Sequence, residues 1–533
     1  MKRLLFILLF SILLPLAFSQ SSVSKDEILA TMKRATQFMV EKVSYKGGYL
    51  WSYMSDFSCQ WGEMEAYKTM IWIQPPGTPA VGNLFLDAYH ATGDEYYYKA
   101  AIETATALIT AQHPSGGWHY MYDFAGEKSM KQWYKTIGAN GWRLEEFQHY
   151  YNNATFDDGG TIEAATLLLR LYVDKENNFI KTALDKAIQF VLVSQYPNGG
   201  WPQRYPKTKK HATKGQPDYT SDITFNDDVA VKNIIFLLLC YNQFNDEAIL
   251  KAIQKGMNNY VQMQLPMPQP GWAMQYSPNG KPAPARSYEP ACISTVTTEN
   301  NIYQLMYFYG LTGEKRFMTR IPEAIDWLDN LHYPDSLIVD GKTHPSFIEM
   351  GTNKPLYIHR RGSNVTNGEY YVDYNHHNTL SHYKSTRSIN VNTLRKSYNK
   401  LISSNPDLFL KNSLLKNKVD LPLYFSRREG KISDLNSRNM PFLEATPENV
   451  KTLIMKLNNE GYWPTRLTAV TNPYIGKAPK KVTPGDYRET RVGDQYDTSP
   501  YIDNDSKIYG ISIGVYIKNM NLLMEYLVNL ENK

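Results

Sequence analysis

Residues Ala111–Trp118 read AQHPSGGW, and residues Ser194–Trp201 read SQYPNGGW. A third copy, between Met263 and Trp272, keeps the Gln, the Gly and the Trp but has a longer loop. Self-similarity of this kind is typical of folds built from repeated helical or β units, in which each unit buries its apolar face against the next. This repeat therefore decides the fold class.

Helix-like segments flank the copies. Apolar residues recur at three- and four-residue spacing in Tyr98–Ala111 and Phe179–Ser194, which lead into the first two copies. Long irregular loops alternate with a second set of apolar helical segments: Thr78–Thr92, Thr161–Val173, Asp227–Tyr241, Thr298–Leu311 and, after Gly461–Trp463, Ile511–Leu530. The pattern predicts an all-α fold, an α/α toroid. We expect an incomplete barrel of helical hairpins with the long loops on one face and a C-terminal extension. Because loops commonly carry function, the cleft is expected on that face.

The N-terminus predicts export. Lys2 and Arg3 precede an apolar run, Leu4–Phe18, so residues 1–20 are interpreted as a signal peptide and the protein as secreted or periplasmic. No later apolar run is long enough to span a membrane, so no membrane association is expected after signal cleavage. We expect a toroid domain at 21–362, an insertion or lid at 363–440, and a helical segment at 441–533 that closes or extends the toroid.

Charge and composition narrow the classes of partner. The formal net charge of +5, without a clustered run of Lys and Arg, argues against a nucleic-acid-binding protein. Aromatic residues make up 13% of the chain, with 40 Tyr. Such a composition suits a carbohydrate-binding cleft, because a sugar ring packs on an aromatic face. A Tyr-rich surface without ligands is the alternative interpretation.

Two acidic loops occupy equivalent places in successive repeats. One contains Asp157 and Asp158, and the other contains Asp227 and Asp228, each before a predicted helix. Asp at a helix start can cap free backbone N–H groups, which is the simplest interpretation. Capping needs one carboxylate, whereas these loops supply four. Clustered carboxylates repel one another unless a cation joins them, and hard oxygen ligands favour Ca²⁺. We therefore predict a shared calcium site.

The third loop carries an arginine instead. Pro284 and Pro290 stiffen the chain around Arg286 and restrict where its guanidinium points. An ion pair between Arg286 and Glu289 is the alternative role that the spacing allows.

Three segments resemble polysaccharide lyase family 10, the pectic acid lyases: Asn198–Pro206, Ile223–Asp228 and Ala283–Pro290. They occur in the family's order, and the resemblance extends over about Lys25 to Gly362. It implies β-elimination of polygalacturonate (pectate), an acidic plant polysaccharide, with Ca²⁺ as cofactor and an Arg as base.

Family roles transfer to matching positions. Arg286 matches the catalytic Arg, Asp157 and Asp158 the first acidic pair, and Asp227 and Asp228 the second. Arg360 fits the position of an Arg that grips a substrate carboxylate. Substrate contacts are thus expected from Arg360, Arg204, Trp201, Trp272 and Tyr288.

The chain also departs from the family. A cationic substrate contact is expected soon after the catalytic Arg, but the next basic residue is Lys315. Fewer cations mean fewer contacts with successive uronates, so a branched or mixed uronate glycan is an alternative substrate. The rival to catalysis is an exported glycan-binding protein that stacks sugars on four residues: Trp51, Trp118, Trp201 and Trp272.

Overall fold

The computed structural model describes residues 23–531 apart from 143, 209, 212–216, 363–364, 366–367, 381–383, 427–433, 439 and 481–494. The predicted signal peptide lies outside the described residues. Four helical hairpins follow one another: α2 (Thr78–Thr92) with α3 (Glu95–Ala111), α5 (Gly160–Asp174) with α6 (Asn178–Ser194), α7 (Val229–Phe244) with α8 (Glu247–Gln262), and α9 (Thr295–Thr312) with α10 (Ile321–Asn330). Short turns join the first three pairs, and side chains cap the helices that follow. Asp94, Asn177 and Asp246 accept backbone N–H groups at the starts of α3, α6 and α8.

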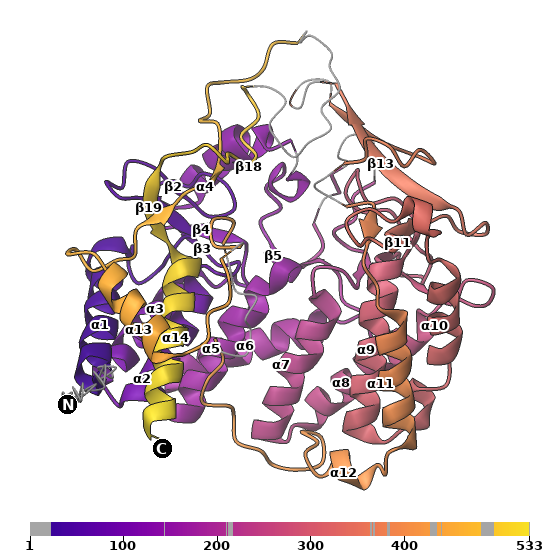
Figure 1. Cartoon of the computed structure of the whole chain (residues 1–533), viewed down its shortest axis with the longest axis horizontal. Helices are drawn as coiled ribbons and strands as arrows, with labels where there is room; N and C mark the ends of the chain where they lie inside the picture. Colours follow the sequence, from indigo (N-terminus) through magenta and orange to yellow (C-terminus); the bar gives the residue numbers. More distant parts are fainter. Residues whose placement is uncertain are drawn as a thin grey trace, which may run out of the picture.

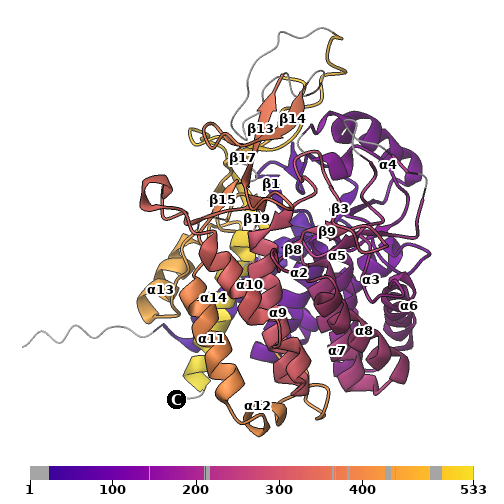
Figure 2. The same cartoon turned by 90° about the vertical axis from the view of Figure 1, so that its right-hand side faces the viewer.

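The first helices of the hairpins form an inner row. Helix α2 packs against α5, and α5 packs against α7. Figure 2 shows α3, α6 and α8 on the outer side of these helices. At the other end α14 (Ile513–Glu531) packs on α2, with α1 (Lys25–Phe38) and α13 (Pro447–Lys456) beside it. Figure 1 shows the helices side by side, with the long loops and strands at one end of them. The predicted α/α toroid is confirmed. None of the described helices is both long enough and apolar enough to cross a membrane.

The tryptophans of the repeat anchor each turn to the helix before it. The indole N–H of Trp118 donates to the Leu108 carbonyl at 2.7 Å, and that of Trp201 donates to the Val191 carbonyl at 2.9 Å. Trp272 and Trp463 make the same bond, to Tyr260 and Leu453. Trp118, Trp201 and Trp272 are fully buried. They therefore belong to the core of the toroid.

The glutamine of the repeat joins neighbouring hairpins. The Gln112 amide donates to Gly116 O within its own turn and to Ala183 O of α6, and Gln195 donates in the same way to Gly199 O and Ala252 O. Gly116 has φ 105°, and a Cβ there would collide with the Lys186 carbonyl of α6. The residues of the repeat thus bind each turn to the next outer helix through the Gln hydrogen bond and the close approach at the Gly. This explains why the Gln, Gly and Trp recur together.

A mixed set of short strands covers the loop end of the helices. A five-stranded antiparallel sheet has the order β14 (Glu369–Asp373), β13 (Pro355–Arg361), β12 (Phe347–Ile348), β10 (Ile293–Ser294) and β8 (Trp272–Ala273). A second, smaller apolar core includes Trp142, Tyr288, Phe347, Ile358 and Tyr370. The predicted boundary at 362/363 falls within the β13–β14 hairpin. A lid role for residues 363–440 stays a prediction.

Residues 410–426, here named the strap, cross the opposite end of the toroid. After α11 (Val391–Ser403) and α12 (Asp407–Leu410), the strap runs past the C-terminal parts of α9, α7, α5 and α2 (Figure 1). Asn242 of α7 donates to Leu414 O and Asn417 O, and Arg170 of α5 donates to Leu423 O. Asp87 of α2 accepts the backbone N–H of Phe425 and Ser426 and pairs with Arg170 at 2.6 Å.

The buried indoles generate a test of the scaffold. We expect Trp118→Ala and Trp201→Ala each to lower the free energy of unfolding by roughly 3–5 kcal/mol, because each leaves a large cavity in a rigid core. Phe179→Ala is the matched control, since Phe179 is 55% exposed, and it should change stability by no more than about 0.5 kcal/mol. Denaturant unfolding measures all three. Stability unchanged in both Trp variants would contradict the anchoring role.

Candidate active site

The two acidic loops have the same backbone path. Each loop follows a short strand that pairs with a strand further along the chain. The first follows β5 (Ala154–Thr155), which pairs with β6 (Arg204–Tyr205), and the second follows β7 (Ile223–Thr224), which pairs with β9 (Gln275–Tyr276). In the first loop Asp158 and Gly159 have φ of 52° and 75°; in the second, Asp227 and Asp228 have φ of 52° and 58°. Asp227 is therefore the counterpart of Asp158, and Asp228 takes the place of Gly159. Non-glycine residues in this left-handed region are strained, and such strain concentrates at functional sites.

Three of the four predicted metal ligands come together. Carboxylate oxygens of Asp157, Asp158 and Asp227 lie within 4.8 Å of one another. Among the described residues, the buried Oδ1 of Asp157 has no hydrogen-bond partner, whereas its Oδ2 accepts from the Tyr120 hydroxyl at 2.5 Å. Asp228 is not part of this group, which corrects its assignment as a ligand. Its position in the turn directs it to a neighbouring cavity on the inner helices.

Arg286 is enclosed by carboxylates. Its Nη2 lies 3.0 Å from Asp157 Oδ2, its Nη1 lies 3.1 Å from Asp227 Oδ2 and 3.3 Å from Glu289 Oε1, and its Nε lies 3.2 Å from Glu146 Oε2. The side chain is only 4% exposed. The predicted pair with Glu289 is thus present, but as one of four. The guanidinium and the acidic cluster form one site.

Glu145 and Glu146 were missed at the sequence level. They lie in the short 3₁₀ helix η3 (Glu145–Phe147), whose Phe147 packs on Trp72 and Trp133. Glu146 pairs with Arg286, and Glu145 accepts the backbone N–H of Ser287 at 2.9 Å. The helix therefore clamps the Arg286 loop. No local pattern marks these residues, because their partners lie far along the chain.

Carboxylates are concentrated in this site. Within the described part of the chain, five carboxylates lie around the Arg286 guanidinium: Asp157, Asp158, Asp227, Glu146 and Glu289. Burial, together with neighbouring carboxylates, raises the pKa of Glu146 and of Asp158 to about 7, although Arg286 counteracts the rise. The pKa of Asp227 is raised well above its usual range for the same reasons. Burial alone would lower the pKa of Arg286, but Glu146, Glu289 and Asp157 raise it well above its ordinary value.

Several predicted substrate contacts are buried in the structure. Trp201 and Trp272 have no exposed surface, and Tyr288 is 1% exposed. An aromatic ring with no exposed face cannot stack on a sugar, so their assignment as substrate platforms is wrong. These rings instead hold the turns and the second apolar core.

The two other predicted contacts are arginines. Arg204 is 1% exposed, lies 4.8 Å from the ring centres of both Tyr120 and Tyr151, and donates to the Glu146 carbonyl. It therefore supports η3, and a contact between Arg204 and substrate stays a prediction. Arg360 of β13 lies over the Trp142 ring at 5.0 Å and is 4% exposed. A contact between Arg360 and substrate stays a prediction.

Residues 123–373 match the family model of the pectic acid lyases. The resemblance predicted from the sequence is confirmed. This region contains Arg286 and all four aspartates of the two loops. No curated protein matches the chain.

Solved structures with similarity include two of family 10 polysaccharide lyase from Cellvibrio cellulosa. The first is 18% identical, covers 52% of this chain and 84% of the other, and has a TM-score of 0.33. The second, a mutant in complex with trigalacturonic acid, is 16% identical, with 61% and 98% coverage and a TM-score of 0.38. An alpha-1,6-mannanase from Salegentibacter sp. HEL1_6 is 11% identical, with 94% and 99% coverage and a TM-score of 0.36.

The raised carboxyl pKa values predict a stability that depends on pH and on a cation. The folded state keeps protons on Asp158 and Glu146 up to about pH 7, whereas the unfolded chain releases them near their ordinary pKa values. Protein treated with a chelator should therefore lose stability as the pH rises from about 5 to about 8. At about pH 8, Ca²⁺ at about a hundred times its Kd should restore about 2.7 kcal/mol.

Calorimetry on two variants locates the effect. Asp227→Ala should abolish the rise in Tm on addition of Ca²⁺, whereas Asp228→Ala, the adjacent residue outside the cluster, should retain it. Equal responses in the two variants would show that the cluster is not the cation site.

Proposed function

We propose that the protein is an exported polysaccharide lyase that cleaves polygalacturonate, or a related mixed uronate glycan, by calcium-assisted β-elimination. One observation carries the proposal: a guanidinium, Arg286, held between Asp157, Asp227, Glu146 and Glu289 within the region that matches the pectic acid lyases. The predicted signal peptide at residues 1–20 supports a secreted or periplasmic location.

The residues of the cluster suit a calcium ion. Asp157, Asp158 and Asp227 would hold it, since Ca²⁺ prefers carboxylate oxygens and Asp157 Oδ1 has no other partner among the described residues. These three neighbouring carboxylates also favour a bound cation, because buried charges are costly unless they are paired. When bound, the ion would supply positive charge that neutralises a uronate carboxylate and lowers the proton affinity of the nearby guanidinium.

Arg286 is the proposed base. β-Elimination removes the proton from C5 beside the uronate carboxylate, forms the C4–C5 double bond and breaks the bond between C4 and its oxygen. As the structure stands, its four carboxylate partners keep Arg286 protonated, and a protonated guanidinium cannot accept a proton. The base role therefore requires a second cation that neutralises Asp157 and Asp227, so that they no longer stabilise the protonated guanidinium. Glu146 and Glu289 would then remain to hold the side chain in place.

The rival function, glycan binding without catalysis, depended on exposed tryptophans. Trp51 is 6% exposed, and Trp118, Trp201 and Trp272 have no exposed surface. Glycan binding without catalysis therefore loses the exposed tryptophans on which it depended. It also gives no role to the arrangement of Arg286 and the carboxylates.

An ultraviolet assay tests the proposed function. Polygalacturonate incubated with the protein and Ca²⁺ should develop the absorbance of an unsaturated uronate, and a strong chelator should abolish it. Asp157→Ala and Asp227→Ala should raise the Ca²⁺ concentration needed for half-maximal rate. Full activity in chelator would refute the role of calcium. No absorbance from any uronate polymer would refute the lyase.

Variants of Arg286 separate a base from a fixed charge. Arg286→Ala should lose about 10²–10⁴-fold in kcat, the usual contribution of a positioned proton-transfer group. Arg286→Lys keeps the charge but loses the planar fork that four carboxylates hold, so a positioned base should fail in it too. If Arg286→Lys kept most of the activity, Arg286 would be an electrostatic contact, and the base would lie elsewhere.

A further inference from the structure

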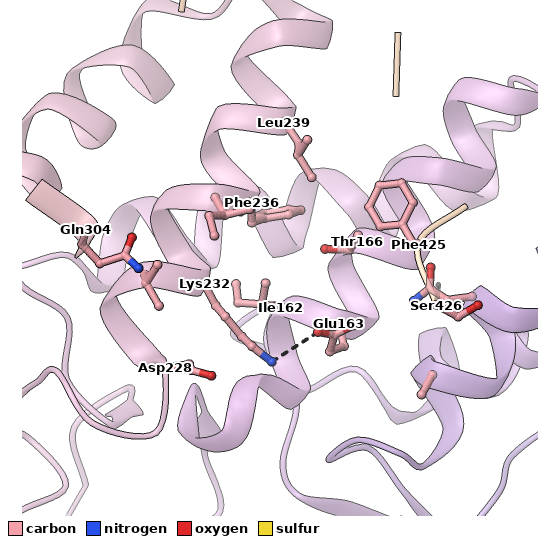
Figure 3. Close-up of a pocket in the computed structure, with 14 residues that line it drawn as sticks. Ile162, Glu163, Thr166, Asp228, Lys232, Phe236, Leu239, Gln304, Phe425 and Ser426 are labelled. Atoms are coloured by element: carbon pink, nitrogen blue, oxygen red, sulfur yellow. Dashed lines mark hydrogen bonds and ion pairs between the residues drawn. The ribbon is translucent and has the colours of Figure 1, made fainter. Parts of the chain in front are cut away.

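A cavity of about 290 Å³ lies on the inner face of the toroid, beside the acidic loops. Its walls come from α2, α5, α7 and α9, and Phe425 and Ser426 of the strap close it at the far end. Figure 3 shows side chains from α5 and α7 pointing into the space between these helices, with Phe425 opposite them. Ligand sites commonly have volumes of about 300–1,000 Å³, so this cavity is at the small end of that range.

The lining combines an apolar surface with polar groups. Ile162, Phe236 and Phe425 contribute apolar surface, and Thr166 and Gln304 contribute a hydroxyl and an amide. Neither of these two polar side chains has a hydrogen-bond partner among the residues that the structure describes. Polar groups placed around an apolar pocket are what fixes the orientation of a small ligand.

Exposed aromatic rings lie on the same helix as Gln304. Tyr303 and Tyr307 of α9 are 38% and 40% exposed. They are four residues apart, so they share a helix face, and Gln304 flanks that face. These rings have exposed surface on which a sugar could pack, but neither lines the cavity, so they would contact only sugar units outside it.

The charges of the cavity disfavour an acidic ligand. Of the residues that the structure describes, three charged side chains line it: Asp228, Glu163 and Lys232. Lys232 Nζ lies 3.3 Å from Glu163 Oε1, so these two charges largely compensate each other, and Asp228 makes this described part of the lining net negative. A carboxylate entering the cavity would meet a like charge, which disfavours it. An uncharged ligand meets no such penalty.

The cavity also adjoins the candidate active site. Lys232 packs against Gly159, where a Cβ would collide with its side chain, and Gly159 directly follows Asp158 of the metal cluster. Asp228, one residue after Asp227, belongs to the cavity. A ligand in this space would therefore lie next to the acidic loops, on the side of the inner helices.

We infer that this cavity binds one uncharged pyranose unit. The volume suits a single sugar ring, the apolar residues suit its C–H face, and Thr166 and Gln304 suit its hydroxyls. That the sugar belongs to a mixed uronate glycan rests on the proposed function. Binding of the neutral ring itself does not.

Methyl NMR with isoleucine labelling tests the inference, because Ile162 and Ile235 line the cavity. The probes are D-galactose and D-galacturonate. They differ only at C6, which is a hydroxymethyl group in D-galactose and a carboxylate in D-galacturonate. D-Galactose should shift the Ile235 resonance, which Ile235→Val identifies, and should leave the resonance of Ile180, buried in α6, unchanged. D-Galacturonate should leave Ile235 unshifted at the same concentration. Equal shifts with both sugars, or no shift with either, would overturn the inference.

Variants of Gln304 locate the ligand. Gln304→Phe should fill the cavity and abolish the shift, and Gln304→Ala, which is less disruptive to folding, should weaken D-galactose roughly 2- to 10-fold by removing one hydrogen bond. Gln189→Phe on the exposed side of α6 is the matched control and should bind normally. Unchanged D-galactose binding in both Gln304 variants would place the ligand elsewhere and refute the assignment.

This result is independent of the lyase assay. If the protein binds D-galactose at Ile235 but forms no unsaturated uronate, this inference stands and the proposed function is refuted. If the protein cleaves polygalacturonate but shows no D-galactose-specific shift, the proposed function stands and this inference is refuted.

Discussion

Arg286 lies between carboxylates from four segments of the chain, one of them its own loop, and the surrounding structure holds this concentration of charge in place. Asp157 and Asp227 come from equivalent turns of successive hairpins, Glu289 comes from the third loop, and Glu146 comes from η3. Burial, together with the neighbouring carboxylates, raises the pKa of Glu146 and of Asp158 to about 7. A site of this kind is ready to bind protons or a metal cation, and the strained turns keep it from relaxing.

The scaffold can hold this arrangement because hydrogen bonds join its helices at both ends. At the loop end, Gln112 and Gln195 join each turn to the next outer helix, and the indoles beside them fill the core. At the other end, the strap satisfies polar groups on inner helices and covers the buried pair of Asp87 with Arg170. Helices held in this way cannot move apart to relieve the repulsion between the carboxylates.

A single turn separates two environments. Asp227 belongs to the carboxylate cluster with Asp157 and Asp158, and the adjacent Asp228 lines the inner cavity. Both residues have a left-handed backbone, which turns successive side chains apart. The first loop has Gly159 where the second has Asp228, and Lys232 occupies the space beside that glycine. The equivalent loops of two repeats therefore serve different purposes. Both loops contribute carboxylates to the cluster, and the second also places Asp228 in the neighbouring cavity.

Local features were predictable from the sequence, and long-range ones were not. The hairpin repeat was found because Gln112, Gly116 and Trp118 act within one turn and its adjacent helix, so their spacing along the chain records their geometry. The chain order of the family motifs likewise located Arg286, Asp157, Asp158 and Asp227. Glu146 could not be found in this way, because it belongs to none of these motifs and no local spacing links it to Arg286, 140 residues further along the chain.

Burial was the other feature that only the tertiary structure decided. Trp201, Trp272 and Arg204 look the same in sequence whether they face a sugar or the core, because exposure depends on what packs on them from elsewhere in the chain. Asp227 and Asp228 are equally plausible ligands in the sequence, but the backbone of the turn separates their carboxylates. The sequence by itself determined the repeat and the chemical groups available. Contacts between distant segments decided which of those groups meet, because a charge or a ring acquires its role only from the neighbours that enclose it.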